Sequence, residues 1–103
     1  MDTERAANSM DALGAPVRLR IYRMLVRAGV DGMSIGRIQQ RTGIPRSTLS
    51  HHLHRLIGSG LVSAQKSGTS LICRADYRAM DDLVGFLSDE CCVEEGRQED
   101  NVA

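Results

Sequence analysis

The spacing of apolar residues along this chain predicts five helices and one hairpin. In five stretches an apolar residue recurs every three or four positions, which is the period of a helix with one buried face. These stretches are residues 4–13, 16–28, 34–41, 45–57 and 76–91. Before the last of them, Leu61–Lys66 and Ser70–Ala75 are strand-like runs around Ser67-Gly68-Thr69, a sequence that favours a hairpin turn. The predicted fold is mainly α with a small β-hairpin, in the order α-α-α-α-β-β-α.

The apolar stripes of these helices define the expected core. Ser34 is the expected N-cap of the third helix, Gly29 ends the second, and Gly58-Ser59-Gly60 ends the fourth. In chain order the core positions are Ala6, Ala7, Met10, Leu13; Val17, Ile21, Met24, Leu25, Ala28; Ile35, Ile38; Leu49, Leu53, Leu56, Ile57; and Met80, Leu83, Val84, Leu87.

The helix predicted over residues 45–57 has the character of a helix that reads DNA. Pro45 suits its first position, where the missing amide hydrogen has no helical acceptor to lose. Opposite the apolar stripe the side chains are hydroxyls, imidazoles and a guanidinium, with no acid among them: Ser47, His51, His54, Arg55. A solvated helix face usually mixes both charge signs, whereas this face suits a polyanion. With the helix before it and the Thr42-Gly43 turn, it forms a predicted helix-turn-helix; a generic helical hairpin is the alternative.

Formal neutrality hides a strong segregation of charge. Residues 14–78 hold eleven basic side chains against two acidic ones, a net charge of +9. Residues 79–103 hold eight acidic side chains against one basic one, a net charge of −7. A basic middle with acidic ends is typical of a phosphate-binding face beside a separate interface or sensing region. Acidic ends kept for solubility would give the same numbers.

Size and composition place the chain in a broad class. Its 103 residues are enough for one domain with a modest core, which gains from a partner subunit. The start of the chain lacks the apolar region of a secretory signal, and no apolar run reaches the ~18 residues that a membrane span needs. Three cysteines, an odd number, argue against a disulfide framework. We therefore expect a cytoplasmic protein with no membrane partner. We also expect one domain over 1–92 and an acidic, disordered tail over 93–103.

The segments ALGAPVRLRIYRML, STLSHHLHRLIGSGLV and SGTSLICRADYRAM together resemble the ArsR/SmtB family of winged helix-turn-helix repressors. The similarity covers roughly residues 10–92. It implies a homodimer that pairs through its first and last helices, with an interface including Met10, Leu13, Leu83, Val84 and Leu87. It also implies two recognition helices in successive major grooves of a palindromic operator, released by an effector that is often a metal ion.

From the recognition helix, the helix before it and the hairpin tip, we predict the DNA contacts. Side chains of the recognition helix would meet phosphates or base edges, while those of the preceding helix and the hairpin would position the protein on the backbone. No cofactor is expected to be required for this binding. The residues are Arg37, Gln40, Arg46, Ser47, Thr48, Ser50, His51, His54, Arg55, Lys66 and Thr69.

The cysteines indicate the inducer. Two common sensor sites of the family are missing, since the third helix reads SIGRIQQ without a Cys-x-Cys motif and the last helix has no histidine. Instead Cys91 and Cys92 lie at the end of the last helix, and some family members use such a pair to respond to trivalent arsenic. Soft As(III) or Sb(III) favours thiolates. We therefore predict a metal site at Cys91 and Cys92, with Cys73 as a possible third ligand, and an inducer of this class.

Other interpretations of these residues stay open. The cysteine pair could sense oxidants or sulfur species, or Cys91 could continue the apolar stripe and simply pack. Cys73 is more readily explained by packing than by ligation. A metal site at His51, His52 and His54 is poorly supported, because that helix is expected to face DNA. A thiol enzyme or metal carrier would be a different class, but the acids around the pair should raise its thiol pKa values, and catalysis is not expected.

Overall fold

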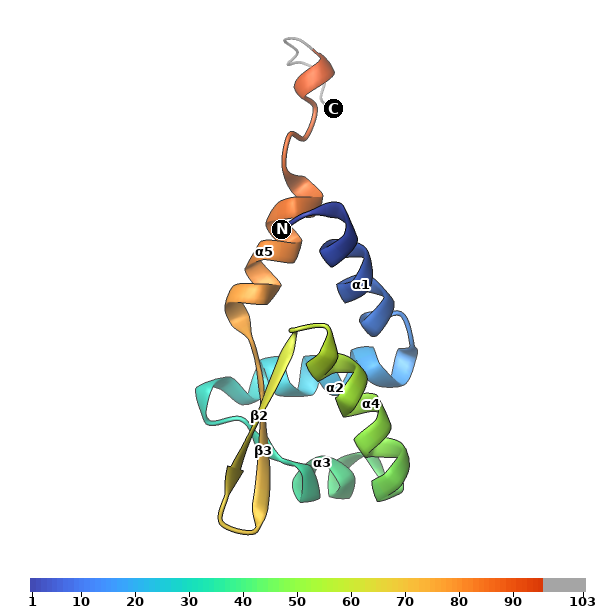
Figure 1. The fold of residues 1–103 in the computed structure, drawn as a ribbon, viewed down its shortest axis with the longest axis vertical. Helices are drawn as coiled ribbons and strands as arrows, with labels where there is room; N and C mark the ends of the chain where they lie inside the picture. The colour runs from blue at the N-terminus through green and yellow to red at the C-terminus, as the bar shows by residue number, and fades with distance from the viewer. Residues whose placement is uncertain (96–103) are drawn as a thin grey trace.

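The computed structural model describes residues 1–95 of the chain and confirms the predicted winged helix-turn-helix (Figure 1). Its five α-helices are α1 (Thr3–Leu13), α2 (Pro16–Ala28), α3 (Ile35–Thr42), α4 (Arg46–Gly58) and α5 (Tyr77–Ser88). Its strands are β1 (Met33–Ser34), β2 (Val62–Ser67) and β3 (Ser70–Ala75), and two short 3-10 turns are η1 (Gly29–Asp31) and η2 (Val93–Glu95). None of the described helices is long and apolar enough to cross a membrane.

Capping side chains determine where three of the helices begin. The amides of Arg5, Arg37 and Ala79 donate to the side chains of Asp2, Ser34 and Asp76, at 2.8, 3.1 and 3.1 Å. These bonds satisfy amides that have no helical acceptor, and they confirm Ser34 as the cap of α3.

Helix α4 begins one residue later than predicted. Pro45 is its N-cap and not its first helical residue, with φ −58° and an extended ψ of 146°. The Pro45 carbonyl accepts the first helical bond from the Leu49 amide at 2.9 Å. The fixed φ of proline suits both positions, so only ψ, which the sequence does not reveal, separates them.

The sheet has a third strand that the sequence pattern did not predict. Strand β3 lies between β1 and β2, and both pairings are antiparallel. Met33 in β1 lies opposite Cys73 in β3. A two-residue strand is too short to show a period-2 pattern. Gly32 permits this pairing, because its φ is +69° and an added Cβ would lie 2.5 Å from the Cys73 carbonyl oxygen.

The core forms where α2, α3 and α4 pack with the inner side of the sheet. Most predicted core positions are buried there or pack partly buried against it, but the buried face of α1 is different. Ala6, Ser9 and Ala12 face inward, whereas the predicted Ala7 and Met10 are exposed. Small inward side chains allow α1 to lie close to α2 and α4. Periodicity was right for Ala6 and Leu13 but wrong for Ala7 and Met10, because tight packing selected small residues over large apolar ones. Ile57, predicted for the core, is also exposed.

Helix α5 is shorter than predicted and ends at Ser88. Acidic Asp89 and Glu90 follow at once, and negative charge is unfavourable at the negative end of the helix dipole. Beyond the helix Glu90 and Cys92 have positive φ values of 61° and 64°, a left-handed conformation that side chains disfavour. Cys91 is exposed, so the interpretation of Cys91 as a packed continuation of the α5 stripe is wrong.

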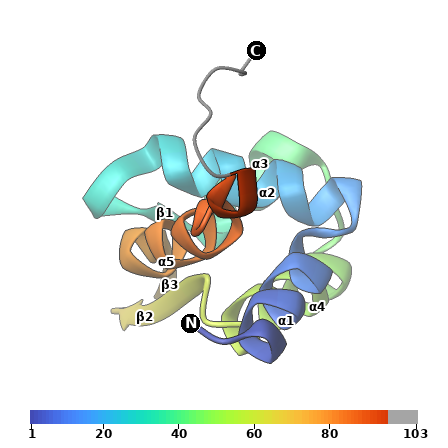
Figure 2. The same ribbon diagram turned by 90° about the horizontal axis from the view of Figure 1, so that it is seen from above.

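The expected tail is only partly described. Val93–Glu95 forms a 3-10 turn where disorder was expected, and residues 96–103 lie outside the described part of the chain. In Figure 1 the α5 end and the start of α1 lie at one end of an elongated molecule, and α3, α4 and the β2–β3 hairpin lie at the other. Seen from above, α1 lies over α4 on one side and the hairpin lies on the other (Figure 2).

Candidate functional site

All residues predicted to contact DNA are exposed, and they lie on the three elements at the lower end of Figure 1. Arg37 and Gln40 are on α3. Lys66 is in β2 and Thr69 is in the turn at the hairpin tip. The remaining seven are on α4: Arg46, Ser47, Thr48, Ser50, His51, His54 and Arg55. The structure therefore brings the predicted set together at one end of the molecule.

The N-terminal end of α4 is available to a phosphate. Among the described residues no side chain caps it, and no acid occurs in its first turn, in contrast to α1. The first amides of a helix lack helical acceptors and carry the positive end of its dipole. This end of α4 can therefore donate backbone hydrogen bonds to an anion.

The core fixes the orientation of the polar face of α4. Leu49, Leu53 and Leu56 are at most 2% exposed, so the opposite face of the helix points outward. Burial of the leucine face thus fixes the direction in which the exposed side chains of α4 point. A helix held in this way presents its polar side chains without prior rearrangement.

Helix α1 holds the side of α4. An Arg55 guanidinium nitrogen lies 2.6 Å from an Asp11 carboxylate oxygen, so this predicted DNA contact already has an anionic partner. The Arg18 Nε donates to the Ala12 carbonyl at 2.6 Å, and its Nη1 lies 3.5 Å from Nδ1 of His52. Burial and the nearby charges of Arg18 and His51 lower the pKa of His52. The neutral His52 ring can then accept from Arg18, so this α2 side chain links the end of α1 to the recognition helix.

The hairpin is anchored at its base by Arg74 of β3. Its Nε donates to the Val30 carbonyl at 2.8 Å, and its Nη1 donates to the Gln65 side-chain oxygen at 3.0 Å. All of β2 beyond Val62 is exposed. The exposed hairpin tip with Lys66 and Thr69 therefore extends from a held base, as expected for a wing that contacts the DNA backbone.

The cysteine pair lies beyond α5, at the opposite end of the molecule. The sulfur atoms of Cys91 and Cys92 are 3.2 Å apart and both residues are exposed. The thiol of Cys91 raises the pKa of Cys92, through a hydrogen bond and through repulsion between the two charges. Two adjacent, accessible sulfurs fit a single soft ion, which would bind most readily once both thiols lose their protons.

Cys73 does not join this pair. It is fully buried in β3 as part of the core, and burial raises the pKa of its thiol. Within residues 1–95 no group of three or more possible ligands is placed to hold a metal ion. The possible third ligand Cys73 is therefore a core residue. A third sulfur for an ion at the pair must come from another molecule.

The predicted dimer surface divides into two groups. Met10, Val84 and Leu87 are 48%, 59% and 59% exposed, which leaves apolar area on α1 and α5 open to a partner. Leu83 is only 6% exposed and Leu13 packs against the core. Leu83 and Leu13 therefore mainly stabilise the fold of a single protomer.

Sequence reasoning missed three arginines of α2. It used Arg20, Arg23 and Arg27 only as part of the basic charge, but they line a groove between α2 and α3. Their i, i+3, i+7 spacing places them on one helix face, and this signal was present in the sequence. Asp11, which holds Arg55, had no such signal.

Comparisons with known proteins agree with this geometry. The helix-turn-helix domain family matches residues 13–63. Nodulation protein NolR of Rhizobium meliloti is 32% identical over 88 residues, which cover 85% of this chain and 70% of NolR. The HTH-type transcriptional regulator YgaV of Escherichia coli K12 is 30% identical over 89 residues, 86% of this chain and 88% of YgaV.

Solved structures share the architecture. The homodimeric winged helix-turn-helix domain Mb0332 of Mycobacterium bovis, a possible ArsR-family regulator, is 25% identical with a TM-score of 0.68. That match covers 93% of this chain and 89% of the other. The chain is a winged helix-turn-helix repressor of the ArsR/SmtB family. As a member of this family, it is a DNA-binding transcriptional regulator and not an enzyme.

Proposed function

We propose that this ArsR/SmtB-family repressor binds a palindromic operator as a homodimer and leaves it when a thiophilic inducer binds at Cys91 and Cys92. The observation that carries the DNA half is the exposed face of α4, which presents hydroxyl, imidazole and guanidinium groups without an acid. Side chains of this kind donate to phosphates and to base edges in the major groove. The uncapped α4 amides and the exposed wing add backbone contacts.

The homodimer is supported by the apolar area left open on α1 and α5. Met10, Val84 and Leu87 are large, apolar and about half exposed or more. Burying such side chains against a second copy is favourable, and a small domain gains stability from it. The similar domain Mb0332 is described as homodimeric. A two-fold dimer would place two α4 helices on one side, which matches the symmetry of a palindromic operator.

The inducer proposal is carried by the geometry of the thiol pair. Two exposed sulfurs 3.2 Å apart suit a soft ion such as As(III) or Sb(III). The third sulfur would come from the partner subunit or from a small thiol. The same exposure leaves oxidation or reaction with sulfur species as the alternative signal, although the raised pKa of Cys92 disfavours its reactive thiolate.

A physical route joins the thiol pair to the recognition helix. Helix α5 contacts α1, and the end of α1 is tied to α4 directly by Asp11–Arg55 and indirectly by Arg18 of α2, which contacts both Ala12 and His52. A change in how α5 pairs with a second copy would move α1, and α1 would move α4. In a dimer a small shift of this kind changes the spacing of the two recognition helices.

Fluorescence anisotropy tests the proposal. The reduced protein is titrated onto a labelled fragment of its own upstream DNA, and arsenite is then added to the complex. We expect arsenite to release the wild type but not the Cys91→Ser/Cys92→Ser variant. Cys73→Ser is the matched control and should respond like the wild type.

Each other outcome has a distinct meaning. If peroxide or polysulfide releases the protein, dithiothreitol reverses this and arsenite has no effect, the pair senses redox state instead. If arsenite releases the double variant as well, the inducer does not act through this pair. Association that does not weaken with salt would contradict the DNA interface, because phosphate contacts release counterions.

A further inference from the structure

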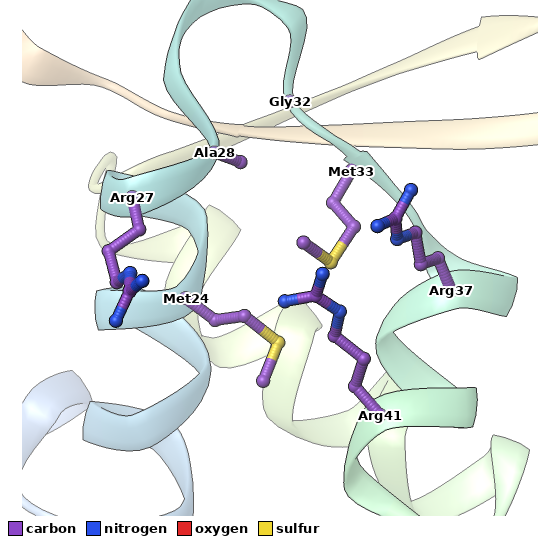
Figure 3. A pocket seen from close by; sticks show the side chains of 7 residues that line it. All are labelled: Met24, Arg27, Ala28, Gly32, Met33, Arg37 and Arg41. Carbon is purple, nitrogen blue, oxygen red and sulfur yellow. The ribbon is translucent and has the colours of Figure 1, made fainter.

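A groove between α2 and α3 is lined by five arginines, of which Arg37 alone is among the predicted DNA contacts. One cavity of about 290 Å³ is bounded by Met24, Arg27, Met33, Arg37 and Arg41, together with Ala28 and Gly32. A second cavity of about 320 Å³ shares three of these residues and adds Arg20 and Arg23. Figure 3 shows Met24, Met33 and Arg41 pointing toward one another, with Arg27 and Arg37 on either side. The two cavities share Met24, Arg27 and Arg41, so they form one groove with a mainly polar, arginine-rich lining.

The five arginines of this groove, like Arg5, Arg46 and Arg78, lack side-chain partners in the described part of the chain, whereas three other arginines are held by partners. Arg18, Arg55 and Arg74 each donate to a carbonyl, carboxylate or amide oxygen. In the described part of the chain, none of the five groove side chains has a carboxylate within 4.0 Å or a hydrogen-bond acceptor. Their guanidinium donors are therefore available, and their like charges repel one another.

This combination suits one kind of ligand. Five like charges around one hollow produce a strong positive potential, which an anion would neutralise. A guanidinium presents a planar fork of donors that matches phosphate oxygens, and it binds phosphate better than an ammonium does. The arginines come from both walls of the groove, Arg20, Arg23 and Arg27 from α2 and Arg37 and Arg41 from α3.

We propose that the α2–α3 groove is a phosphate-binding site. The phosphate can come from a small phosphorylated molecule, which would act as a second ligand of the repressor. It can also come from the DNA backbone beyond the stretch that α4 covers, since Arg37 belongs both to the groove and to the predicted DNA contacts. Binding of DNA phosphates in the groove rests on the proposed function, whereas binding of a small phosphorylated molecule does not.

Inorganic pyrophosphate is the probe for a small ligand. The groove variant Arg23→Gln/Arg27→Gln loses two charges of α2 and leaves the predicted DNA contacts intact. The control Arg5→Gln/Arg78→Gln loses two exposed charges of α1 and α5 instead. At constant ionic strength we expect pyrophosphate to raise the thermal midpoint of the wild type and of the control. Calorimetry should show at least tenfold weaker pyrophosphate binding by the groove variant.

DNA fragments of two lengths test the other source. If the groove holds DNA phosphates, a fragment extended on both sides should bind the wild type with a steeper salt dependence than a short one. The groove variant should lose up to about two units of that slope, near 0.9 per phosphate, and the control should lose none. Pyrophosphate binding that depends on the groove supports the site even if no DNA binds, which would contradict the proposed function alone. The groove proposal is overturned if groove and control variants behave alike with both probes.

Discussion

The DNA-facing end and the thiol end of this repressor are held in different ways. Behind the DNA face, Leu49, Leu53 and Leu56 of α4 are almost fully buried, and Asp11 and Arg18 tie that helix to α1. At the other end Leu83 is the last buried residue within 1–95, and every residue from Ser88 to Glu95 is exposed. The thiol pair lies in this exposed segment, where Glu90 and Cys92 have a left-handed conformation.

This difference bears on how the repressor would work. A single protomer already builds the surface that we propose reads DNA, because burial of one face of α4 orients the other. The thiol end gains little from the protomer's own core, so a second copy or a bound ion would decide its arrangement. A sensor that the protomer leaves loosely held can be reorganised by a weak signal at small cost in stability.

The largest expected effect is a loss of stability when a buried leucine of α4 is truncated, compared with the same truncation of an exposed leucine of α5. Leu53→Ala should lower the free energy of unfolding by about 2–5 kcal/mol, because it leaves a cavity behind α4. Leu87→Ala, the matched change on exposed α5, should leave protomer stability nearly unchanged and weaken the dimer. Urea unfolding and sedimentation equilibrium measure the two quantities. Equal losses of protomer stability would mean that the two ends are held alike.

His51→Ala is expected to act on DNA binding alone. The side chain is exposed on the polar face of α4, and removing its hydrogen bond to a base or phosphate should weaken binding by about 1–3 kcal/mol. The thermal midpoint should not change. Anisotropy with upstream DNA measures the affinity, and full affinity in this variant would contradict the assigned face of α4.

The buried cysteine should affect stability and not sensing. Cys73→Ser places a hydroxyl in the core, which should destabilise the fold by about 1–3 kcal/mol unless it finds an acceptor. Cys91→Ser/Cys92→Ser should leave the unfolding curve in place. A loss of inducer response in Cys73→Ser, with the fold intact, would assign Cys73 to the sensor.

The ion pair beside α4 should have a smaller effect. Asp11→Asn frees Arg55, and since both groups are exposed the protein should lose less than about 1 kcal/mol of stability. DNA affinity at low salt should rise slightly, because Arg55 no longer divides its time between Asp11 and a phosphate. Arg55→Ala should instead weaken binding. If both variants bind DNA like the wild type, Arg55 does not touch the backbone.

The smallest effect concerns the pH at which Cys92 reacts. Its pKa is raised chiefly by the hydrogen bond and the charge of Cys91, so its thiolate forms only at higher pH. Removing that cause in Cys91→Ala should lower the pKa of Cys92 and shift its alkylation to lower pH. Iodoacetamide rates across pH, read by peptide mass spectrometry, test this shift. An unchanged profile would show that the two sulfurs do not interact.

Local chemistry made much of the fold predictable. Ser34 begins α3 as its hydroxyl requires, Gly29 ends α2, and β3 runs from Ser70 to Ala75 as its pattern indicates. Predictions were wrong where packing between segments decides the outcome. Strand β1 exists only because β3 lies beside it, and α1 buries small residues because it lies close to its neighbours.

The candidate site divides in the same way. The exposed polar face of α4 follows from the sequence, because the period of a helix places leucines on one side and polar groups on the other. The pairing of Arg55 with Asp11, the burial of Cys73 away from the thiol pair, and the groove of arginines do not follow from it. Each depends on segments far apart in the chain.

The sequence alone determined the order of the elements, the identity of the recognition helix, the segregation of charge and the place of the thiol pair in the chain. These depend on neighbouring residues, through periodicity, caps and turns. Only the tertiary structure decided which arginines are held and which remain available, which cysteine is core, and where α5 stops. Those outcomes depend on burial and on contacts between distant segments, and a linear pattern does not contain them.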